Sequence, residues 1–270
     1  MNQPILELID LATHFKTKSA GLFGKQSVIR AVDGISLKVN AGEVLSLVGE
    51  SGCGKSTVGR TLTHLEKATS GKALFEGRDI LQLSPSEFRP LRREIQMIFQ
   101  DPFASLNPRL TIEKTLSEPL FIHKLANNRE QARSMIKDIL ELVGMDPKIM
   151  TRFPHEFSGG QRQRIGIARV MILKPKLVIA DEAVSALDVS IQAQVLNLIK
   201  KLQRDSGVAM LFISHDLGVV RHISDRVAVM YKGKIVEMGG KKQIFENPQH
   251  EYTKRLLASI PRIITHKEPA

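Results

Sequence analysis

The expected fold follows from one stretch, "EVLSLVGESGCGKST" at residues 43–57. Its apolar part, 43–49, has the length of a short buried strand, and the residues from Lys55 onward have the pattern of a helix. Between them, Gly49 to Ser56 match the P-loop pattern of glycine, four residues, glycine, lysine and serine. A plain glycine turn between strand and helix is the alternative, and the coincidence of strand, lysine and serine disfavours it.

Each residue type in this loop has a chemical reason. Gly52 and Gly54 let successive backbone N–H groups turn towards a β-phosphate, at the start of a helix whose dipole adds partial positive charge. Lys55 can reach the β- and γ-oxygens, and Ser56 offers a hydroxyl to Mg²⁺. We interpret Cys53 as a loop filler. The loop therefore predicts a nucleotide site.

Composition limits the functional classes. The chain has 270 residues, of which 42% are hydrophobic and 25% charged, as in ordinary globular proteins with a sizeable core. Its net charge of +11 should attract phosphates, nucleic acid or the anionic face of a membrane. A single cysteine excludes an internal disulfide. We see neither a secretory signal nor an apolar run near ~18 residues, so we expect a cytosolic chain that meets the membrane through a partner.

Further strands and helices are predicted from hydrophobic patterns. Short apolar runs at 176–182 and 208–215, separated by helical stretches, indicate a parallel sheet covered on both faces. A helix at 191–202 has one apolar stripe, made of Ile191, Val195, Leu198, Ile199 and Leu202. The segments "LELIDLATHF", "AVDGISLKV" and "KALFEGRDI" alternate and predict a β-rich layer, with a mobile hairpin tip at 19–27.

The middle of the chain changes character. Residues 100–173 hold loops and amphipathic helices, one of which starts at Asn128 and stops at Gly144. We therefore predict one α/β domain spanning 1–270: a P-loop NTPase core with a mostly parallel sheet, an antiparallel β subdomain and an inserted α-helical subdomain. The core and β subdomain occupy 1–99 and 174–240, the helical subdomain 100–173, and a C-terminal extension 241–270.

Two adjacent acids, Asp181 and Glu182, end the 176–182 strand at the edge where ligands bind in open parallel sheets. In phosphoryl transfer the first carboxylate of such a pair supports Mg²⁺ and the second orients the attacking water, so we take Glu182 as the catalytic base. The alternative is a strand that simply ends in solvent with two acids.

Two further polar residues follow predicted strands. His215 comes after "LFIS" and would lie near the same phosphates, although a lone histidine there is more often packed or exposed. Gln100 closes "IQMIFQD", and its amide could ligate Mg²⁺ or contact the attacking water, but a solvent-facing strand end is equally consistent with the pattern.

A second glycine-rich helix start occurs in "FSGGQRQR", residues 157–164. Ser158 and Gln161 have the spacing of a capping box, which needs no ligand. A cap alone does not call for two glycines, and their lack of side chains would let an anion approach the helix N–H groups. Both interpretations remain open from the residues alone.

The order of these motifs, from P-loop through Gln100, "FSGGQ", "LVIADE" and "SALD" to His215, resembles the ATP-binding subunits of ABC transporters over nearly the full chain. "FQDPFASLNPRLT" and "ENPQHEYTKRLLASIP" are similar to the oligopeptide and dipeptide importer branch, which also serves glutathione and nickel. The resemblance implies an ABC ATPase fold, ATP and Mg²⁺ as cofactors, and ATP hydrolysis coupled to import.

The resemblance also implies a role for each matching position. Phe15 corresponds to the aromatic residue that stacks on adenine, and His215 to a γ-phosphate switch. Gln100 corresponds to the magnesium and water contact, with Ser56 and Asp181 also at the metal. The phosphate cradle comprises Gly49, Glu50, Ser51, Gly52, Cys53, Gly54, Lys55, Ser56 and Thr57. The residues that complete the opposing subunit's site, or cross the same interface, are Ser158, Gly160, Gln161 and Asp188.

Two positions depart from the commonest pattern of that family. Ala183 stands where a proline usually follows the catalytic glutamate, which removes a rigid φ beside Glu182. Phe157 replaces the usual signature leucine and stays apolar, so we expect no loss. The branch generally uses two different ATPase subunits, one with a C-terminal cysteine cluster. With Cys53 as its only cysteine, this chain resembles the other one.

The implied partners are a second homologous ATPase subunit in a heterodimer, two integral membrane permease subunits and, indirectly, a solute-binding protein. The implied location is peripheral, on the cytoplasmic face of the inner membrane. A rival hypothesis is an ATP-dependent nucleic-acid protein of the same superfamily, which the charge of +11 allows. One compact cassette, without a long coiled coil or a tandem repeat, counts against it, so no specific nucleic acid is expected.

Overall fold

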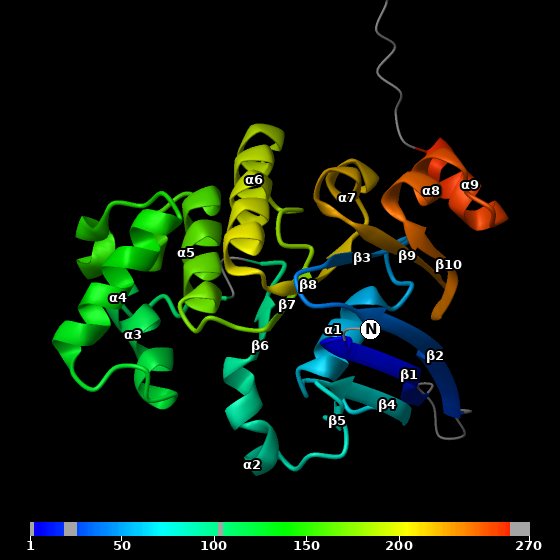
Figure 1. Cartoon of the computed structure of the whole chain (residues 1–270), viewed down its shortest axis with the longest axis horizontal. Helices are drawn as coiled ribbons and strands as arrows, with labels where there is room; N and C mark the ends of the chain where they lie inside the picture. Colours follow the sequence, from blue (N-terminus) through cyan, green and yellow to red (C-terminus); the bar gives the residue numbers. More distant parts are fainter. Residues whose placement is uncertain (1–2, 19–25, 102–104, 260–270) are drawn as a thin grey trace, which may run out of the picture.

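A computed structural model describes residues 3–18, 26–101 and 105–259. The predicted hairpin tip at 19–27 lies mostly outside these ranges. Two sheets lie side by side, helices flank the larger one, and a group of helices extends to one side (Figure 1). This arrangement confirms the predicted α/β class with a parallel core, an antiparallel sheet and a helical part.

The larger sheet has the order β10-β9-β3-β8-β7-β6. All neighbours are parallel except the edge pair β9–β10. Every residue of β3, β7 and β8 is buried, which explains why the sequence shows continuous apolar runs there rather than alternation. The strands are β3 (Val44–Val48), β6 (Ile95–Ile98), β7 (Leu177–Asp181), β8 (Ala209–Ser214), β9 (Arg226–Tyr231) and β10 (Lys234–Gly240).

The smaller sheet is antiparallel and has the order β2-β1-β4-β5. Its strands are β1 (Leu6–Lys18), β2 (Gln26–Val39), β4 (Ser70–Phe75) and β5 (Arg78–Asp79). Helix α1 (Lys55–Leu62) lies between the two sheets, and its Val58 and Leu62 join one apolar cluster with Leu8, Leu45 and Leu211. The phosphate-binding loop therefore starts a helix that is buried on both sides.

Helices from the middle of the chain form the group on the left of Figure 1. They are α3 (Ile112–Ile122), α4 (Arg129–Leu142) and α5 (Gly159–Met171), and the short η2 (Pro147–Thr151) and η3 (Pro154–Glu156) connect α4 to α5. The short α2 (Pro85–Phe88) and η1 (Pro90–Arg93) precede β6 in the chain, and Phe88 of α2 belongs to the apolar cluster that contains α1. Asn128 caps α4 by accepting a hydrogen bond from the Gln131 N–H at 2.9 Å, as its position predicts. The exact division of the chain into subdomains stays a prediction.

Helix α6 (Val189–Ser206) is longer than the predicted 191–202 and ends at Gly207, whose φ is 66°. Its predicted stripe is buried except for the partly exposed Ile191. At the other end of the molecule, α7 (Leu217–Ile223), α8 (Lys241–Glu246) and α9 (Glu251–Ala258) pack on β9 and β10. Within the described ranges, every helix is too short or too polar to cross a bilayer.

Candidate functional site

The loop between β3 and α1 opens into a hollow of about 200 Å³ at the carboxyl ends of the parallel strands. Residues from four parts of the chain converge there. They are Ala31 of β2, Ser51, Gly52, Gly54, Lys55, Ser56 and Thr57 of the loop and α1, Gln100 after β6, and Glu182 after β7. The hollow therefore collects the predicted loop, one predicted acid and the predicted amide.

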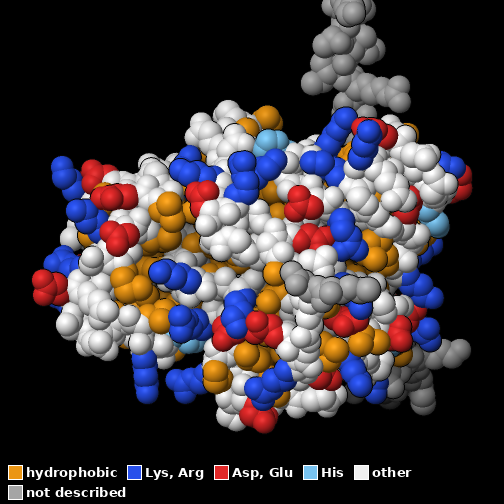
Figure 2. Space-filling model, in the orientation of Figure 1, with side chains coloured by type: hydrophobic (Ala, Val, Ile, Leu, Met, Phe, Trp, Pro, Cys, Tyr) orange, Lys and Arg blue, Asp and Glu red, His pale blue; other side chains and the backbone are white. Residues whose placement is uncertain are grey.

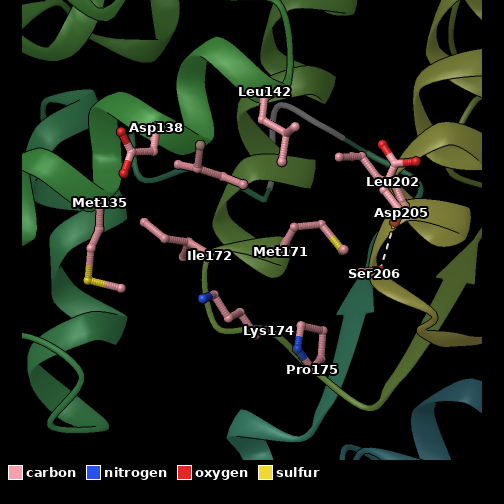
Figure 3. A pocket seen from close by; sticks show the side chains of 11 residues that line it. Met135, Asp138, Leu142, Met171, Ile172, Lys174, Pro175, Leu202, Asp205 and Ser206 are labelled. Atoms are coloured by element: carbon pink, nitrogen blue, oxygen red, sulfur yellow. Dashed lines mark hydrogen bonds between the residues drawn. The ribbon is translucent and has the colours of Figure 1, made fainter.

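A larger hollow, of about 620 Å³, lies elsewhere, between the ends of α4, α5 and α6. Its lining is mainly apolar, with Leu142 and Met171 among the side chains (Figure 3). Asp138 and Asp205 lie on opposite sides of it and come from different helices (Figure 3). Size alone therefore does not identify the chemical site, and the convergence of polar groups favours the smaller hollow.

Two glycines of the loop are required by close packing. A side chain at Gly49 would place its Cβ 2.1 Å from the Met230 carbonyl oxygen, and one at Gly54 would place it 1.9 Å from the Ala31 carbonyl oxygen. At Gly52, whose φ is 78°, nothing lies within 4 Å of such an atom. The loop is thus held between β9 and β2, while its middle faces open space that an anion can enter.

Lys55 and the start of α1 give this space its positive character. Lys55 is 4% exposed, and its Nζ donates to the Gly49 and Glu50 carbonyl oxygens at 2.7 and 2.8 Å. Helix α1 begins at Lys55 after the N-cap residue Gly54, without a side-chain cap, and its first turn contains no acid. The helix dipole and its first N–H groups are thus available to a phosphate.

Ser56 and Asp181 form an oxygen-rich pair beside the loop. The Ser56 hydroxyl donates to Asp181 Oδ1 at 2.8 Å, and Asp181 is 4% exposed. Burial raises the pKa of Asp181, the hydrogen bond from Ser56 acts in the opposite direction, and the charge of Glu182 raises it further. Hydroxyl and carboxylate oxygens are ligands that Mg²⁺ prefers, so this pair suits a magnesium ion.

Glu182 is hydrogen-bonded to Gln100 and His215, the two polar residues that follow other predicted strands. The Gln100 amide Nε2 donates to Glu182 Oε2 at 2.8 Å, and His215 Nδ1 lies 2.9 Å from Oε1. The Glu182 side chain is 12% exposed and that of His215 51%. Glu182 has a φ of 47°, in the left-handed region, where the chain leaves β7. The carboxylate therefore has a fixed orientation beside the hollow.

Ten of the eighteen predicted site residues are not among the residues that line this hollow. Five of the ten adjoin it, as parts of the loop or through hydrogen bonds to lining residues: Gly49, Glu50, Cys53, Asp181 and His215. The other five lie elsewhere. Phe15 is half-buried on β1, opposite Ile29 of β2. Asp188 precedes α6, is exposed, and makes no capping bond with its side chain. The other three, Ser158, Gly160 and Gln161, begin α5.

The start of α5 forms the predicted capping box. Ser158 Oγ accepts from the Gln161 N–H at 3.3 Å, and Gln161 Oε1 accepts from the Ser158 N–H at 3.0 Å. Both side chains are exposed, whereas a Cβ at Gly160 would lie 2.3 Å from Ile191 Cγ2 of α6. Gly160 is therefore required by packing against α6, a reason that the sequence pattern did not indicate, and access of an anion to this segment stays a prediction. At Gly159 the nearest such contact is an ordinary 3.6 Å.

Sequence reasoning missed two residues of the site. Ala31 lines the hollow, and its carbonyl group packs closely against Gly54. The Tyr252 hydroxyl, from α9, accepts a hydrogen bond from the Glu50 N–H at 3.0 Å. Neither residue lies in a motif with a mechanism of its own, although Tyr252 falls in the "ENPQHEYTKRLLASIP" segment that carried the resemblance.

Comparisons with known protein families agree with this geometry. The profile of a family described as "ABC transporter" matches residues 32–185, and one described as "Oligopeptide/dipeptide transporter, C-terminal region" matches 236–270. The oligopeptide transport ATP-binding protein AppF of Bacillus subtilis is 54% identical over 96% of this chain and 79% of its own length. The glutathione import ATP-binding protein GsiA of Pectobacterium atrosepticum is 52% identical over 96% of this chain and 41% of its own length.

Solved structures show the same fold. The ATP-binding cassette MJ0796, in a dimeric post-hydrolysis state bound to ADP and Pi, superimposes with a TM-score of 0.77. That likeness covers 87% of this chain and 98% of the other, at 27% sequence identity.

The contact between Gly160 and Ile191 leads to a stability prediction. Gly160→Ala should lower the free energy of unfolding of the isolated chain by about 1–3 kcal/mol, because a buried methyl group overpacks the α5–α6 contact. Gly159→Ala is the matched control and should be neutral or stabilising, since alanine favours helix. Urea unfolding without nucleotide measures both. Equal stability of the two variants, or no rescue of Gly160→Ala by Ile191→Ala, would contradict the packing argument.

Proposed function

Because the chain belongs to the ABC transporter family, and within it to the oligopeptide and dipeptide branch, we propose that it energises solute uptake by a bacterial ABC import complex. It is an ATPase subunit, as its family membership and site geometry indicate. The solute is a peptide, or a related small solute such as glutathione or nickel. The observation that carries the proposal is the Glu182 carboxylate fixed beside the loop hollow by Gln100 and His215.

Glu182 is the proposed base for the water that attacks the γ-phosphate. Each of its oxygens receives one hydrogen bond and keeps a further acceptor position, so a water can donate to it while Gln100 and His215 hold the carboxylate. Lys55 donates two of its three N–H bonds to loop carbonyl oxygens, and the third would reach the β- and γ-oxygens while these contacts orient the side chain. Ser56, Asp181 and Gln100 would hold Mg²⁺, which when bound screens the charge on the phosphates.

The surface segments are proposed to complete the site of a second ATPase subunit. Ser158 and Gln161 are exposed, and Val189, next to Asp188, is 83% exposed. A head-to-tail dimer would bring these residues to the nucleotide bound by the opposing subunit's loop. Phe15 would stack on the adenine of the nucleotide that its own chain binds. We propose a heterodimer, as in the branch that the chain resembles.

Membrane subunits are proposed to dock beside the segment that follows Gln100. A groove of about 540 Å³ lies there, lined by Gln96 of β6, Asn107, Leu110 and Ile122 of α3 among others. Ile122, which lines this groove, is 52% exposed, which suits an apolar side chain of a partner helix. Two permease subunits in this position would keep the chain peripheral, on the cytoplasmic face of the inner membrane, with a solute-binding protein acting indirectly.

The nucleic-acid hypothesis receives less support. Figure 2 shows Lys and Arg side chains interspersed with Asp and Glu over the face drawn, without a continuous basic stripe there. The profile match at 236–270 is to a transporter region. Tight, salt-sensitive binding of DNA or RNA at physiological ionic strength would favour that rival over import.

Glu182→Gln should leave ATP binding intact and reduce hydrolysis by about 100-fold or more, because an amide accepts no proton from the attacking water. Titration calorimetry measures binding, and phosphate release measures turnover in the assembled complex. Glu141→Gln, an exposed change on α4, is the control that should alter neither. Near-normal turnover of Glu182→Gln would remove Glu182 from the mechanism.

Ser158→Arg should impair hydrolysis by the assembled complex while the isolated chain binds ATP as before. The added side chain would enter the nucleotide site of the opposing subunit rather than that of its own chain. Ser86→Arg, at an exposed position of α2, is the control. Loss of ATP binding by the isolated Ser158→Arg chain would instead place the segment at its own site.

The uptake proposal is tested by purifying the tagged chain from native membranes and identifying the proteins that accompany it. A second ATPase subunit and two permeases should be recovered. Di- and oligopeptides, glutathione and Ni²⁺ are then compared for stimulation of ATP hydrolysis by that complex with its binding protein. Recovery without permeases, or failure of all of these solutes to stimulate hydrolysis, would count against the proposal.

A further inference from the structure

We propose that Tyr252 is a positioning residue of the nucleotide site, through which the C-terminal helix α9 holds the peptide group that orients Lys55. The Tyr252 hydroxyl accepts from the Glu50 N–H at 3.0 Å, and the tyrosine is 3% exposed. A contact of this kind places part of the 236–270 region directly against the phosphate-binding loop.

The bonded N–H belongs to the same peptide group as the Gly49 carbonyl oxygen. Lys55 Nζ donates to that oxygen at 2.7 Å. Because a peptide group is planar, fixing the direction of its N–H also fixes the direction of its C=O. Tyr252 and Lys55 thus hold opposite sides of the planar Gly49–Glu50 peptide group. Loss of the hydroxyl would let this peptide group rotate, and the orientation of Lys55 would change with it.

The same bond determines what Glu50 contributes to the loop. Its N–H points to Tyr252, and its carbonyl oxygen accepts from Lys55 Nζ at 2.8 Å. The Glu50 backbone therefore stabilises the cradle from behind, and its carbonyl oxygen also accepts from the Cys53 N–H at 3.3 Å. Tyr252 acts on the lysine and not on the ligand itself.

The position of Tyr252 is fixed by hydrogen bonds at the start of α9. Glu237 of β10 accepts from the backbone N–H groups of Gln249 and His250 at 2.8 and 3.0 Å, and His250 Nδ1 accepts from the Tyr252 N–H at 3.1 Å. Burial acts to raise the pKa of Glu237, but the neighbouring Thr253 hydroxyl and these N–H groups bring it below its usual value. The carboxylate stays ionised and anchors the turn before α9.

Contacts from β9 and the following turn support the loop beside the tyrosine. The rings of Tyr231 and Tyr252 lie 4.2 Å apart, and the Gly233 N–H donates to the Cys53 carbonyl oxygen at 3.1 Å. Together with the approach of Gly49 to Met230, these contacts hold the first half of the loop against β9. The Tyr252 hydroxyl adds a side-chain hydrogen bond to these packing and backbone contacts.

The test is the change Tyr252→Phe, which keeps the ring and removes the hydroxyl. The full chain should bind ATP and ADP about threefold to tenfold more weakly in titration calorimetry, as expected for one lost hydrogen bond that orients a binding group. Its midpoint of thermal unfolding without nucleotide should stay near that of the unchanged chain. In the assembled complex the KM for ATP should rise while kcat is kept, because Glu182, Gln100 and His215 are untouched.

Tyr231→Phe is the matched control, since it removes a neighbouring hydroxyl that has no bond to the loop backbone in the described part of the chain, and it should leave ATP affinity unchanged. Unchanged affinity of Tyr252→Phe would overturn the proposal. So would equal losses of affinity and thermal stability in both variants, which would mean that the effect is not specific to the hydroxyl that bonds the loop. Failure of the unchanged chain to bind ATP would instead overturn the proposed function.

Discussion

The approach of Gly54 to the Ala31 carbonyl group, too close for any side chain, fixes the phosphate-binding loop between the two sheets. Helix α1 leaves the loop at this point and is buried between the sheets, so the antiparallel sheet determines where the helix starts. The parallel sheet supplies the polar residues, because β6, β7 and β8 all end at the same edge. The geometry of the site thus depends on how the antiparallel sheet is positioned relative to the parallel sheet.

Local sequence patterns predicted the structural features that depend only on residues close together in the chain. The buried runs of β3, β7 and β8 and the caps at Asn128 and Ser158 are signals contained within a few residues. The contacts of Ala31 and Tyr252 went unpredicted because they join distant segments, as in the bond from Glu50 to a hydroxyl 202 residues away. Strands β9 and β10 also went unpredicted, although their mutual pairing is local. The meeting of Gln100, Glu182 and His215 followed from the parallel sheet, but its hydrogen bonds did not.

Gly160 links the two surface segments proposed to meet a second subunit. Its missing side chain lets α5 approach Ile191 of α6, near the start of that helix and close to Asp188. Ser158 at the start of α5 is therefore fixed relative to Asp188 by a contact within the chain. The two segments would reach an opposing nucleotide as one rigid unit, which removes part of the entropy cost of ordering them on assembly.

Glu182 carries a conformational cost. Its φ of 47° suits glycine or asparagine, and a left-handed conformation costs a residue with a longer side chain roughly 1 kcal/mol. Selection for folding alone would favour replacing this glutamate. Heat-resistance engineering by statistical preference alone would therefore replace the residue proposed above as the catalytic base, so Glu182 should be excluded from such changes.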